Sequence, residues 1–319
     1  MKTVNSAENP GIATEAFIIG YGDIGSRVAR LYLQENSTVS GLARSPSSAQ
    51  QMKDIGVTPV TADLDNIQSL QGLPLANSVV YYFAPPPLKG LTDPRMGNFL
   101  ASLGSNSLPR RIVYISTSGV YGDQGGGWVT EDTPTNPGAE RSHRRLDAEN
   151  RLRQFRQQYN VELVILRVGG IYGPGRLPEQ RIRDHIPVIR EELAPKTNRI
   201  HADDLAAICV AAGKSGRDGE IYNVSDGCDS NMTEYFYLVA DHLGLQRPPA
   251  IDWNTAKQVL SQGMLSYLRE SRRMDNRKML EELDITLKYP DLTSGLANSS
   301  LYPSTKERKI QYPFLYQTG

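Results

Sequence analysis

The sequence has few cysteines, since only Cys209 and Cys228 occur among its 319 residues. Two cysteines are too few for a disulfide framework, so the chain is not a disulfide-stapled secreted domain. Cys209 lies in an apolar helical stretch, where a cysteine more often fills space in a core than acts as a nucleophile. This cysteine usage suits a protein of a reducing compartment.

The sequence also lacks net charge and long apolar runs. Its 35 Lys and Arg residues balance 35 Asp and Glu residues, so no overall field favours nucleic acid or an anionic membrane surface as a partner. No apolar run approaches the roughly 20 residues that a membrane-spanning helix needs. No apolar signal-peptide segment precedes the first expected strand. We therefore expect a cytoplasmic protein without a membrane partner.

Glycines, in contrast, form an ordered pattern near the N-terminus. Residues 16–35 read as a strand, a tight turn and a helix, and the turn has the sequence Gly20-Tyr21-Gly22-Asp23-Ile24-Gly25. Gly20 permits a sharp turn, Gly22 lets the backbone approach a pyrophosphate, and Gly25 lets the helix pack close to the strand. The free N–H groups that follow Gly22, at the positive end of the helix, would face the anion. This stretch predicts a dinucleotide site.

Strand and helix patterns then alternate as far as Pro174. The expected strands are nearly continuous apolar runs, as in a parallel sheet buried on both faces, and comprise Thr38–Leu42, Val57–Thr61, Ser78–Ala84, Arg111–Ser116 and Val161–Arg167. The expected helices between them comprise 65–71, 93–104 and 140–159. This order predicts an α/β protein with a doubly wound parallel Rossmann sheet.

The regular alternation of strand and helix patterns ends at Pro174. The expected elements there are helices at 178–193, 203–213, 232–243 and 275–283 and a strand at Glu220–Val224. The expected domains are a nucleotide-binding domain of residues 14–174 and 200–226, a smaller and mostly helical lobe of residues 175–199 and 227–295, and loose termini at 1–13 and 296–319. The substrate should lie in the cleft between the domain and the lobe.

Six motifs occur along the chain in a fixed order. They are Gly20-Tyr-Gly22-Asp-Ile-Gly25, Tyr114-Ile-Ser-Thr-Ser-Gly-Val-Tyr-Gly122, Glu131-Asp-Thr-Pro134, Arg167-Val-Gly-Gly-Ile-Tyr-Gly-Pro-Gly175, Arg199-Ile-His-Ala-Asp-Asp204 and Ile221-Tyr-Asn-Val-Ser225. This ordered set resembles the extended short-chain dehydrogenase/reductase family, the NAD-dependent epimerases and dehydratases. The resemblance covers residues 14–295.

The resemblance implies roles for several residues. Thr117, four residues before the Tyr of the Val-Tyr-Gly motif, would hydrogen-bond the substrate oxygen. Asp63 and Leu64 after the third strand would flank the adenine, and the loop at Ala84 and Pro85 would lie along the cofactor. The implied substrate is a small molecule, such as a nucleotide sugar or another carbonyl compound.

The sequence lacks the family's catalytic pair, Tyr-x-x-x-Lys. Alignment on the family's Ala-Glu, here Ala148-Glu149, puts Arg141 at the Tyr position and Arg145 at the Lys position. This pattern resembles atypical members, in which cofactor binding survives and the standard active site does not. Arg141 stays protonated near neutral pH, so it can hold an anion or polarise a carbonyl but cannot be a base. Arg145 can still donate to ribose hydroxyls. Another proton donor would be needed, either a bound water or Tyr121, although the Tyr of this motif usually packs.

The second strand ends without the acid that commonly holds the ribose 2′-hydroxyl of NAD. The sequence there is Gly41-Leu-Ala-Arg44-Ser45. Arg44 can pair with a 2′-phosphate and Ser45 can add a hydrogen bond, although Arg44 could instead stack on the adenine. We predict NADP(H) in preference to NAD(H), and no residue pattern predicts a metal site.

Three functions remain open. The first is an oxidoreductase or isomerase that uses a nicotinamide cofactor with altered acid/base groups. The second is a catalytically inactive NADP(H)-binding regulatory protein. The third is an RNA-binding module that uses the arginines of residues 140–159, but no aromatic series accompanies them and a solvated face is favoured. Arg176, Arg181 and Arg183 would suit an anionic substrate such as a nucleotide sugar, although solvation at the surface explains them about as well. A homodimer through the helices at 93–104 and 140–159 is the expected assembly.

Overall fold

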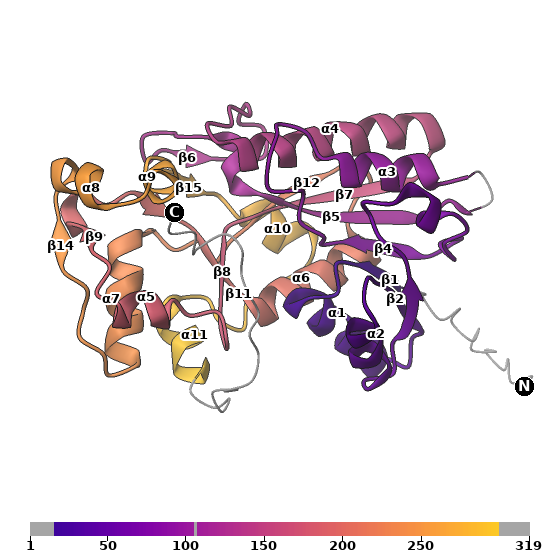
Figure 1. The fold of residues 1–319 in the computed structure, drawn as a ribbon, viewed down its shortest axis with the longest axis horizontal. Coiled ribbons are helices and arrows are strands. Elements are labelled where there is room, and N and C mark those ends of the chain that lie inside the picture. The colour runs from indigo at the N-terminus through magenta and orange to yellow at the C-terminus, as the bar shows by residue number, and fades with distance from the viewer. Residues whose placement is uncertain (1–15, 105–106, 300–319) are drawn as a thin grey trace, which may run out of the picture.

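The sheet that the alternating pattern predicts forms the centre of the molecule. The computed structural model describes residues 16–104 and 107–299 of the chain (Figure 1). Seven parallel strands lie in the order β12-β7-β5-β4-β1-β2-β3. The expected doubly wound α/β fold is confirmed. The predicted loose terminus 1–13 and most of 296–319 lie outside the described residues.

The strands lie close to the expected apolar runs. Their bounds are β1 (Ala16–Ile19), β2 (Val39–Ala43), β3 (Thr58–Thr61), β4 (Val79–Tyr82), β5 (Arg111–Thr117), β7 (Glu162–Val168) and β12 (Ile221–Val224). Every residue of β1 and β4 is buried, which explains why their sequences are apolar without alternation. The direction of winding reverses between β1 and β4. Ligands of such sheets bind beyond the carboxyl ends of the strands at this reversal.

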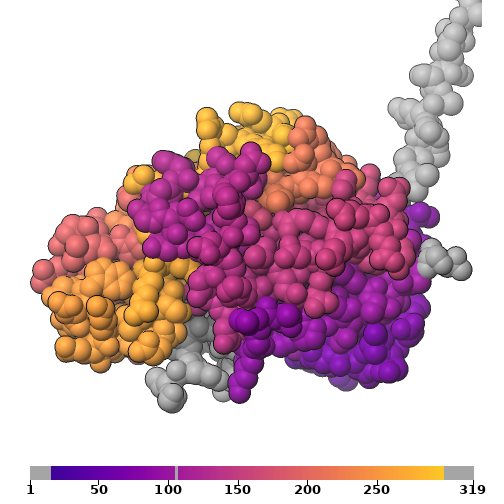
Figure 2. Space-filling model, turned by 90° about the horizontal axis from the view of Figure 1, so that it is seen from above, coloured from indigo at the N-terminus to yellow at the C-terminus, as the bar shows by residue number. Residues whose placement is uncertain are grey.

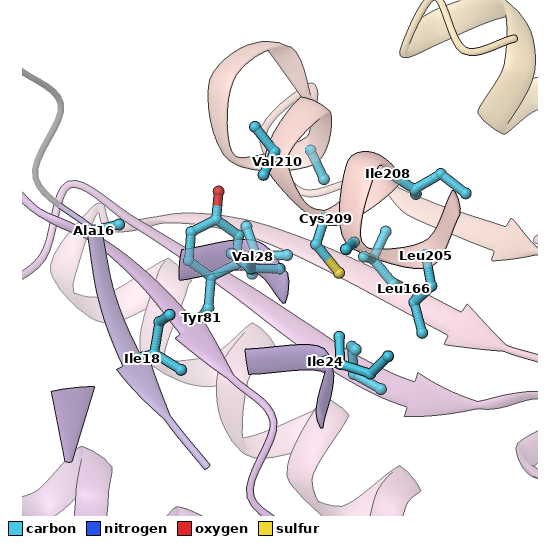
Figure 3. Packing of buried hydrophobic residues seen from close by; sticks show 14 of the residues in the cluster. Ala16, Ile18, Ile24, Val28, Tyr81, Leu166, Leu205, Ile208, Cys209 and Val210 are labelled. Atoms are coloured by element: carbon cyan, nitrogen blue, oxygen red, sulfur yellow. The ribbon is translucent and has the colours of Figure 1, made fainter. Parts of the chain in front are cut away.

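Helices cover both faces of the sheet (Figure 1). One face carries α3 (Pro94–Ser102) and α4 (Glu140–Tyr159), and the other carries α1 (Asp23–Gln34), α2 (Pro46–Lys53) and α6 (Ala202–Ser215). On the second face, Val28 of α1 and Cys209 of α6 lie in one buried cluster with Tyr81 of β4 (Figure 3). Cys209 is fully buried, as expected for a core residue, and burial raises the pKa of its thiol.

Further helices form a smaller lobe around a third apolar cluster. They are α5 (Glu179–Arg183), α7 (Met232–His242), α8 (Trp253–Val259), α9 (Gln262–Leu268) and α11 (Leu292–Ser299). Ile182, Phe236 and Leu265 contribute buried side chains to this cluster from α5, α7 and α9. α10 (Arg277–Glu282) falls within the predicted lobe 227–295 but packs against β12, and its Met279 joins the core of the sheet.

The predicted helix 178–193 is wrong. The chain there forms α5, then the short strand β9 (Val188–Ile189) and a single 3₁₀ turn, η4 (Glu191–Leu193). Pro187 has no N–H to donate and disfavours the helical conformation at Ile186, so a helix cannot continue through this point. His185 already leaves the helical conformation, with a φ of 51°.

Short elements complete the fold and connect its parts. The strand pairs are β6 (Trp128–Val129) with β15 (Arg273–Met274), β8 (Gly170–Tyr172) with β11 (Arg199–His201), β9 with β14 (Ala250–Ile251) and β10 (Lys196–Thr197) with β13 (Ser230–Asn231). The 3₁₀ turns are η1 (Ile67–Leu70), within the predicted helix 65–71, η3 (Ser118–Tyr121) and η4 (Glu191–Leu193). Among the helices of the described residues, none is both long and apolar enough to cross a membrane.

The buried carboxylate of Glu149 fixes α4 to the sheet. It accepts hydrogen bonds from Ser116 in β5 (2.6 Å) and from Arg167 of β7 (2.8 Å). Arg153, one turn further along α4, also donates to it (2.7 Å). The guanidinium of Arg167 lies 4.8 Å from the centre of the Tyr121 ring. Because a buried charge must be paired and hydrogen-bonded, this network holds α4 in one position.

Glu149→Ala should lower the free energy of unfolding by about 3–5 kcal/mol, because it leaves Arg167 buried without its counter-charge. Urea denaturation followed by circular dichroism measures the change. Glu179→Ala is the control, since it deletes a carboxylate from the exposed Arg183–Glu179 pair, and it should cost less than about 1 kcal/mol. Equal losses in the two variants would contradict the anchoring role of Glu149.

Candidate active site

The glycine turn lies at the reversal between β1 and β4. Gly20 has a φ of 92°, and a Cβ atom there would be 2.4 Å from the backbone N of Ala84. That N–H donates to the carbonyl of Ile19 (3.1 Å), so the loop at Ala84 and Pro85 lies against the turn. A Cβ atom on Gly25 would be 2.9 Å from the carbonyl O of Gly20. The fold itself therefore requires the first and third glycines.

Gly22 differs from the other two glycines of the turn. A Cβ atom there would meet nothing within 4 Å. Gly22 is also the N-cap of α1, and no side chain caps the N–H groups of the first turn, which begins with Asp23 and Ile24. Backbone N–H groups at a helix N-terminus bind phosphate. The open space and these donors fit the pyrophosphate of a dinucleotide.

Two arginines neutralise the carboxylate of Asp23. One carboxylate oxygen accepts from Nε of Arg27, one turn along α1 (2.9 Å), and the other pairs with Nε of Arg176 (2.5 Å). Arg27 also pairs with Asp203 at the start of α6. Arg176 lies 153 residues from Asp23 in the chain, so no local pattern predicts this pair.

Arg44 is exposed at the end of β2, next to the N-cap of α2. Ser45 is that N-cap, and its hydroxyl accepts from the backbone N of Ser48 (3.2 Å) and lies 3.0 Å from the hydroxyl of Ser47. Arg44 forms no ion pair with a described carboxylate. An exposed guanidinium and hydroxyl groups beside a helix N-terminus are suited to a phosphate group.

Arg95 of α3 connects the two other loops that the sequence predicts around the cofactor. In the loop after β3, which begins with Asp63 and Leu64, Oδ1 of Asp63 accepts from the backbone N of Asp65 (3.0 Å). Arg95 donates two hydrogen bonds to Asp65 (2.8 and 2.6 Å) and one to the carbonyl of Pro85 (3.1 Å). Hydrogen bonding from Arg95 lowers the pKa of Asp65. No local pattern predicts the role of Arg95, because its partners lie in other segments.

A cavity of about 400 Å³ opens where β5 and β7 end and α4 begins. Thr117, Arg141 and Arg145 line it, and Tyr121 does not. Small-lobe residues complete its wall; seen from above, the orange surface of α8 and α9 lies beside the magenta surface of the segment that contains α4 (Figure 2). A shallower hollow of about 480 Å³ beside Trp253 contains none of the predicted site residues.

Thr117 is the last residue of β5 and begins the 3₁₀ turn η3. Its hydroxyl oxygen accepts from the backbone N of Gly119 (3.2 Å), which leaves the hydroxyl hydrogen for an acceptor in the cavity. Ser142 of α4 lies close by, because a Cβ atom on Gly119 would be 2.5 Å from its hydroxyl oxygen. Ser142 lines the same cavity. The predicted position of Thr117 beside a substrate oxygen is therefore geometrically available.

Arg141, at the position aligned with the family's Tyr, reaches across to the small lobe. It donates to the hydroxyl of Ser266 (3.0 Å), lies 4.0 Å from a carboxylate oxygen of Glu270, and stands 5.6 Å from the centre of the Tyr267 ring. Arg145, at the Lys position, turns toward β5. It donates to the carbonyl of Ile115 (3.1 Å) and to the hydroxyl of Tyr114 (3.3 Å).

Tyr121 is buried inside the fold. Its hydroxyl donates to the side-chain carbonyl of Asn223 (2.7 Å), and burial raises its pKa. Because this hydroxyl is committed to Asn223 and lines no part of the cavity, the suggested role of Tyr121 as proton donor is not supported by its position. The structure brings together Thr117, Arg141 and Arg145, and it leaves Tyr121 outside.

Two further arginines, which the sequence analysis did not single out as site residues, line the cavity. Arg144 donates to the carbonyl of Gly90 (2.6 Å), and Arg272 donates to the carbonyl of Gly122 (2.7 Å) and pairs with Glu270 (3.0 Å). Arg144 belongs to the arginine-rich helix, which is a weak signal. Arg272 lies 150 residues from Gly122, so only the folded chain reveals it.

A family model matches residues 16–225, which include the glycine turn and the cavity residues of β5, α4 and β7. The chain belongs to the NAD dependent epimerase/dehydratase family. The dTDP-D-glucose 4,6-dehydratase of Homo sapiens is 24% identical over 143 residues, which are 42% of this chain and 41% of that protein. Protein YeeZ of Escherichia coli strain K12 is 26% identical over 181 residues, which are 57% of this chain and 59% of that protein. The chain thus matches roughly half of the length of these relatives.

Several solved structures share the fold of this chain over most of its length. A conserved protein of unknown function from Silicibacter pomeroyi is 28% identical, with a TM-score of 0.74 over 90% of this chain and 98% of that chain. The UDP-glucose 4-epimerase of Thermotoga maritima, solved with UDP-glucose, is 17% identical, with a TM-score of 0.73 over 89% of this chain and 96% of that chain. The dTDP-glucose 4,6-dehydratase of Bacillus anthracis, in complex with NAD, is 20% identical, with a TM-score of 0.71 over 90% and 95%.

Gly22→Ala should fold with wild-type stability but bind NADPH at least about tenfold more weakly, a loss of about 1.4 kcal/mol. The added methyl group meets no protein atom, yet it would occupy the space in which the backbone approaches a pyrophosphate. Melting without cofactor and titration of NADPH fluorescence measure the two quantities. Gly20→Ala is the contrasting variant, because its positive φ and its clash with Ala84 should lower the melting temperature itself. Unchanged NADPH affinity in Gly22→Ala would place the cofactor elsewhere.

Proposed function

We propose that the chain is an NADP(H)-dependent oxidoreductase or isomerase with a non-standard active site, acting on a nucleotide sugar or a small carbonyl compound. The observation that carries this proposal is the open face of Gly22 beside uncapped helix N–H groups, at the sheet reversal. The cavity lined by Thr117 provides a place for a substrate oxygen. The nucleotide-sugar names of the relatives support the substrate class.

In this proposal, each residue of the cavity has a separate role. The nicotinamide, when bound, supplies hydride transfer. Thr117 donates a hydrogen bond to the substrate oxygen. Arg145 donates one N–H to a ribose hydroxyl in place of the family's Lys, which leaves further N–H groups of its guanidinium for the substrate. Arg141 keeps its proton at neutral pH, so it polarises or holds substrate but does not shuttle a proton. A water in the cavity, oriented by Ser142, is then the proton source.

Loss of the usual proton shuttle has a kinetic consequence. General acid/base catalysis contributes about 10²–10⁴-fold in rate. Reaction with the usual substrates of the family is therefore expected to be slow by a factor in this range. A substrate whose own acidic group delivers the proton would escape this loss.

Arg44→Ala should weaken NADPH binding at least about tenfold, because a charge-assisted hydrogen bond to a phosphate is among the stronger ones. NADH binding should change little, because NADH has no 2′-phosphate. Fluorescence titration of both reduced cofactors against wild type and variant measures the selectivity. Arg30→Ala, on the exposed face of α1, is the control. Equal wild-type affinities for NADPH and NADH would contradict the proposed preference for NADP(H).

Thr117→Val should lower kcat on any active substrate by about 10²-fold or more, since the substrate oxygen loses its positioned donor. Tyr121→Phe should change stability rather than kcat, because it removes only the hydrogen bond to Asn223. Steady-state assays over a panel of nucleotide sugars and small carbonyl compounds measure both. Rates ordinary for such enzymes, abolished by Arg141→Ala alone, would show that the role given to Arg141 is wrong.

A second candidate function is a regulatory protein that binds NADP(H) without turnover. The observation that favours it is the contact of Arg141 with Ser266, which fills the aligned catalytic position with a link between α4 and α9. Deuteride transfer from labelled NADPH into a metabolite pool separates the two candidates. Transfer into a carbonyl product supports the enzyme, and tight NADPH binding without transfer supports the regulator.

A further inference from the structure

We propose that the cavity binds a substrate through an oxyanion group, a carboxylate or a phosphate, held by the guanidinium groups of Arg144, Arg145 and Arg272. This inference rests on the proposed function, because it names a group that the substrate must carry near its reacting oxygen. It concerns the end of the cavity beside Thr117 and not the diphosphate of a cofactor.

The charge of the cavity wall is strongly unbalanced. Six positively charged side chains and one acid line it, namely Arg141, Arg144, Arg145, Arg176, Arg272 and Lys196 against Glu270. Three of these cations are matched by acids outside the lining, since Arg176 pairs with Asp23 (2.5 Å), Lys196 with Asp229 (2.7 Å) and Arg144 with Glu140 (3.6 Å). The guanidinium groups of Arg141, Arg145 and Arg272 and the carboxylate of Glu270 therefore remain around the rest of the space.

Arg145 has only neutral hydrogen-bond acceptors among the described residues. One is the carbonyl of Ile115 and the other is the hydroxyl of Tyr114, whose pKa burial raises to about 12, so that it stays neutral at pH 7. The buried carboxyl of Asp93 attracts Arg145 without forming an ion pair, and burial raises the pKa of that carboxyl. Arg145 is thus a cation that faces the cavity without a close counter-charge.

Arg144 and Arg272 are buried, with 2% and 9% of their surfaces exposed, and Nε of each has no partner among the described residues. The ion-pair partner of Arg144 among the described residues is the exposed Glu140, at 3.6 Å. Arg272 shares Glu270 with Arg141, and its Nη2 lies 3.4 Å from the hydroxyl of Ser118. Because Ser118 follows Thr117, Arg272 is connected to the expected position of the substrate oxygen.

Buried cations without partners are costly, and each unsatisfied guanidinium N–H adds to the cost. An oxyanion with two or three oxygens accepts from several guanidinium groups at once, which arginine recognises better than lysine does. A neutral substrate would leave these donors unsatisfied. The excess positive charge of the lining, and Arg145 with its neutral acceptors, therefore select an acidic ligand.

The test is a calorimetric titration of the full chain saturated with NADPH, which keeps anions out of the cofactor's own phosphate sites. The probes are malonate, inorganic phosphate and malonamide, the neutral counterpart of malonate. At least one anion should bind about tenfold or more tightly than malonamide. The stronger of malonate and phosphate identifies the group as a carboxylate or a phosphate.

Variants place the site within the cavity. Arg145→Met and Arg272→Met should each weaken binding of the preferred anion about tenfold or more. The affinity of Arg145→Lys should lie between those of Arg145→Met and wild type, because lysine keeps the charge but loses the paired N–H donors of the guanidinium. Arg247→Met is the control, since Arg247 pairs with Asp241 on the exposed surface outside the cavity. Thermal melting checks folding, and if Arg272→Met does not fold, Arg145→Met decides.

The proposal would be overturned if neither malonate nor phosphate bound more tightly than malonamide, or if the anion affinity were unchanged in Arg145→Met. The titration needs no turnover, so anion binding without hydride transfer would support this site while the enzymatic function failed. Conversely, turnover of neutral carbonyl compounds without anion binding would keep the function and remove the oxyanion site.

Discussion

The buried charge of Glu149 is the interaction on which the rest of the site depends. α4 buries few apolar side chains along its 20 residues, and its buried residues include Arg144 and Glu149 themselves. A helix of this composition cannot be oriented by a broad apolar stripe alone. The hydrogen bonds from Ser116 and Arg167 to Glu149 supply the missing orientation. Every cavity residue that α4 carries owes its position to this anchor.

Arginine at the two positions aligned with the catalytic pair changes what the cavity can do. A phenol and an amine can exchange a proton near neutral pH when their surroundings shift their pKa values, but a guanidinium cannot. Arg141 and Arg145 instead provide fixed charge and directed N–H groups. The two arginines also contact different parts of the fold, since Arg141 donates to the small lobe and Arg145 donates to β5. The cavity is therefore lined by fixed positive charge, beside hydroxyl groups that include those of Thr117 and Ser142.

Local pattern was enough to predict the sheet, its buried strands and the glycine turn, because each depends on residues close together in sequence. The helix predicted at 178–193 failed because the turn chemistry of His185 and Pro187 outweighed the surrounding helical composition. The motif of Tyr121 makes it a candidate for catalysis, but its ring is buried against Arg167 and its hydroxyl donates to Asn223. The contacts of Arg95, Arg176 and Arg272 could not be predicted, since each joins a segment distant in the chain.

The ion pairs of Asp23 have a consequence for how the glycine turn meets a ligand. The turn already contains a tethered anion, and that anion holds Arg27 and Arg176 in place. A diphosphate that bound next to these guanidinium groups would undergo an ion exchange, because it would compete with a carboxylate that the chain keeps at high effective concentration. Small solution anions are poor competitors in such an exchange. A ligand that also accepts hydrogen bonds from the helix N–H groups at Gly22 has additional contacts with which to compete against the Asp23 carboxylate.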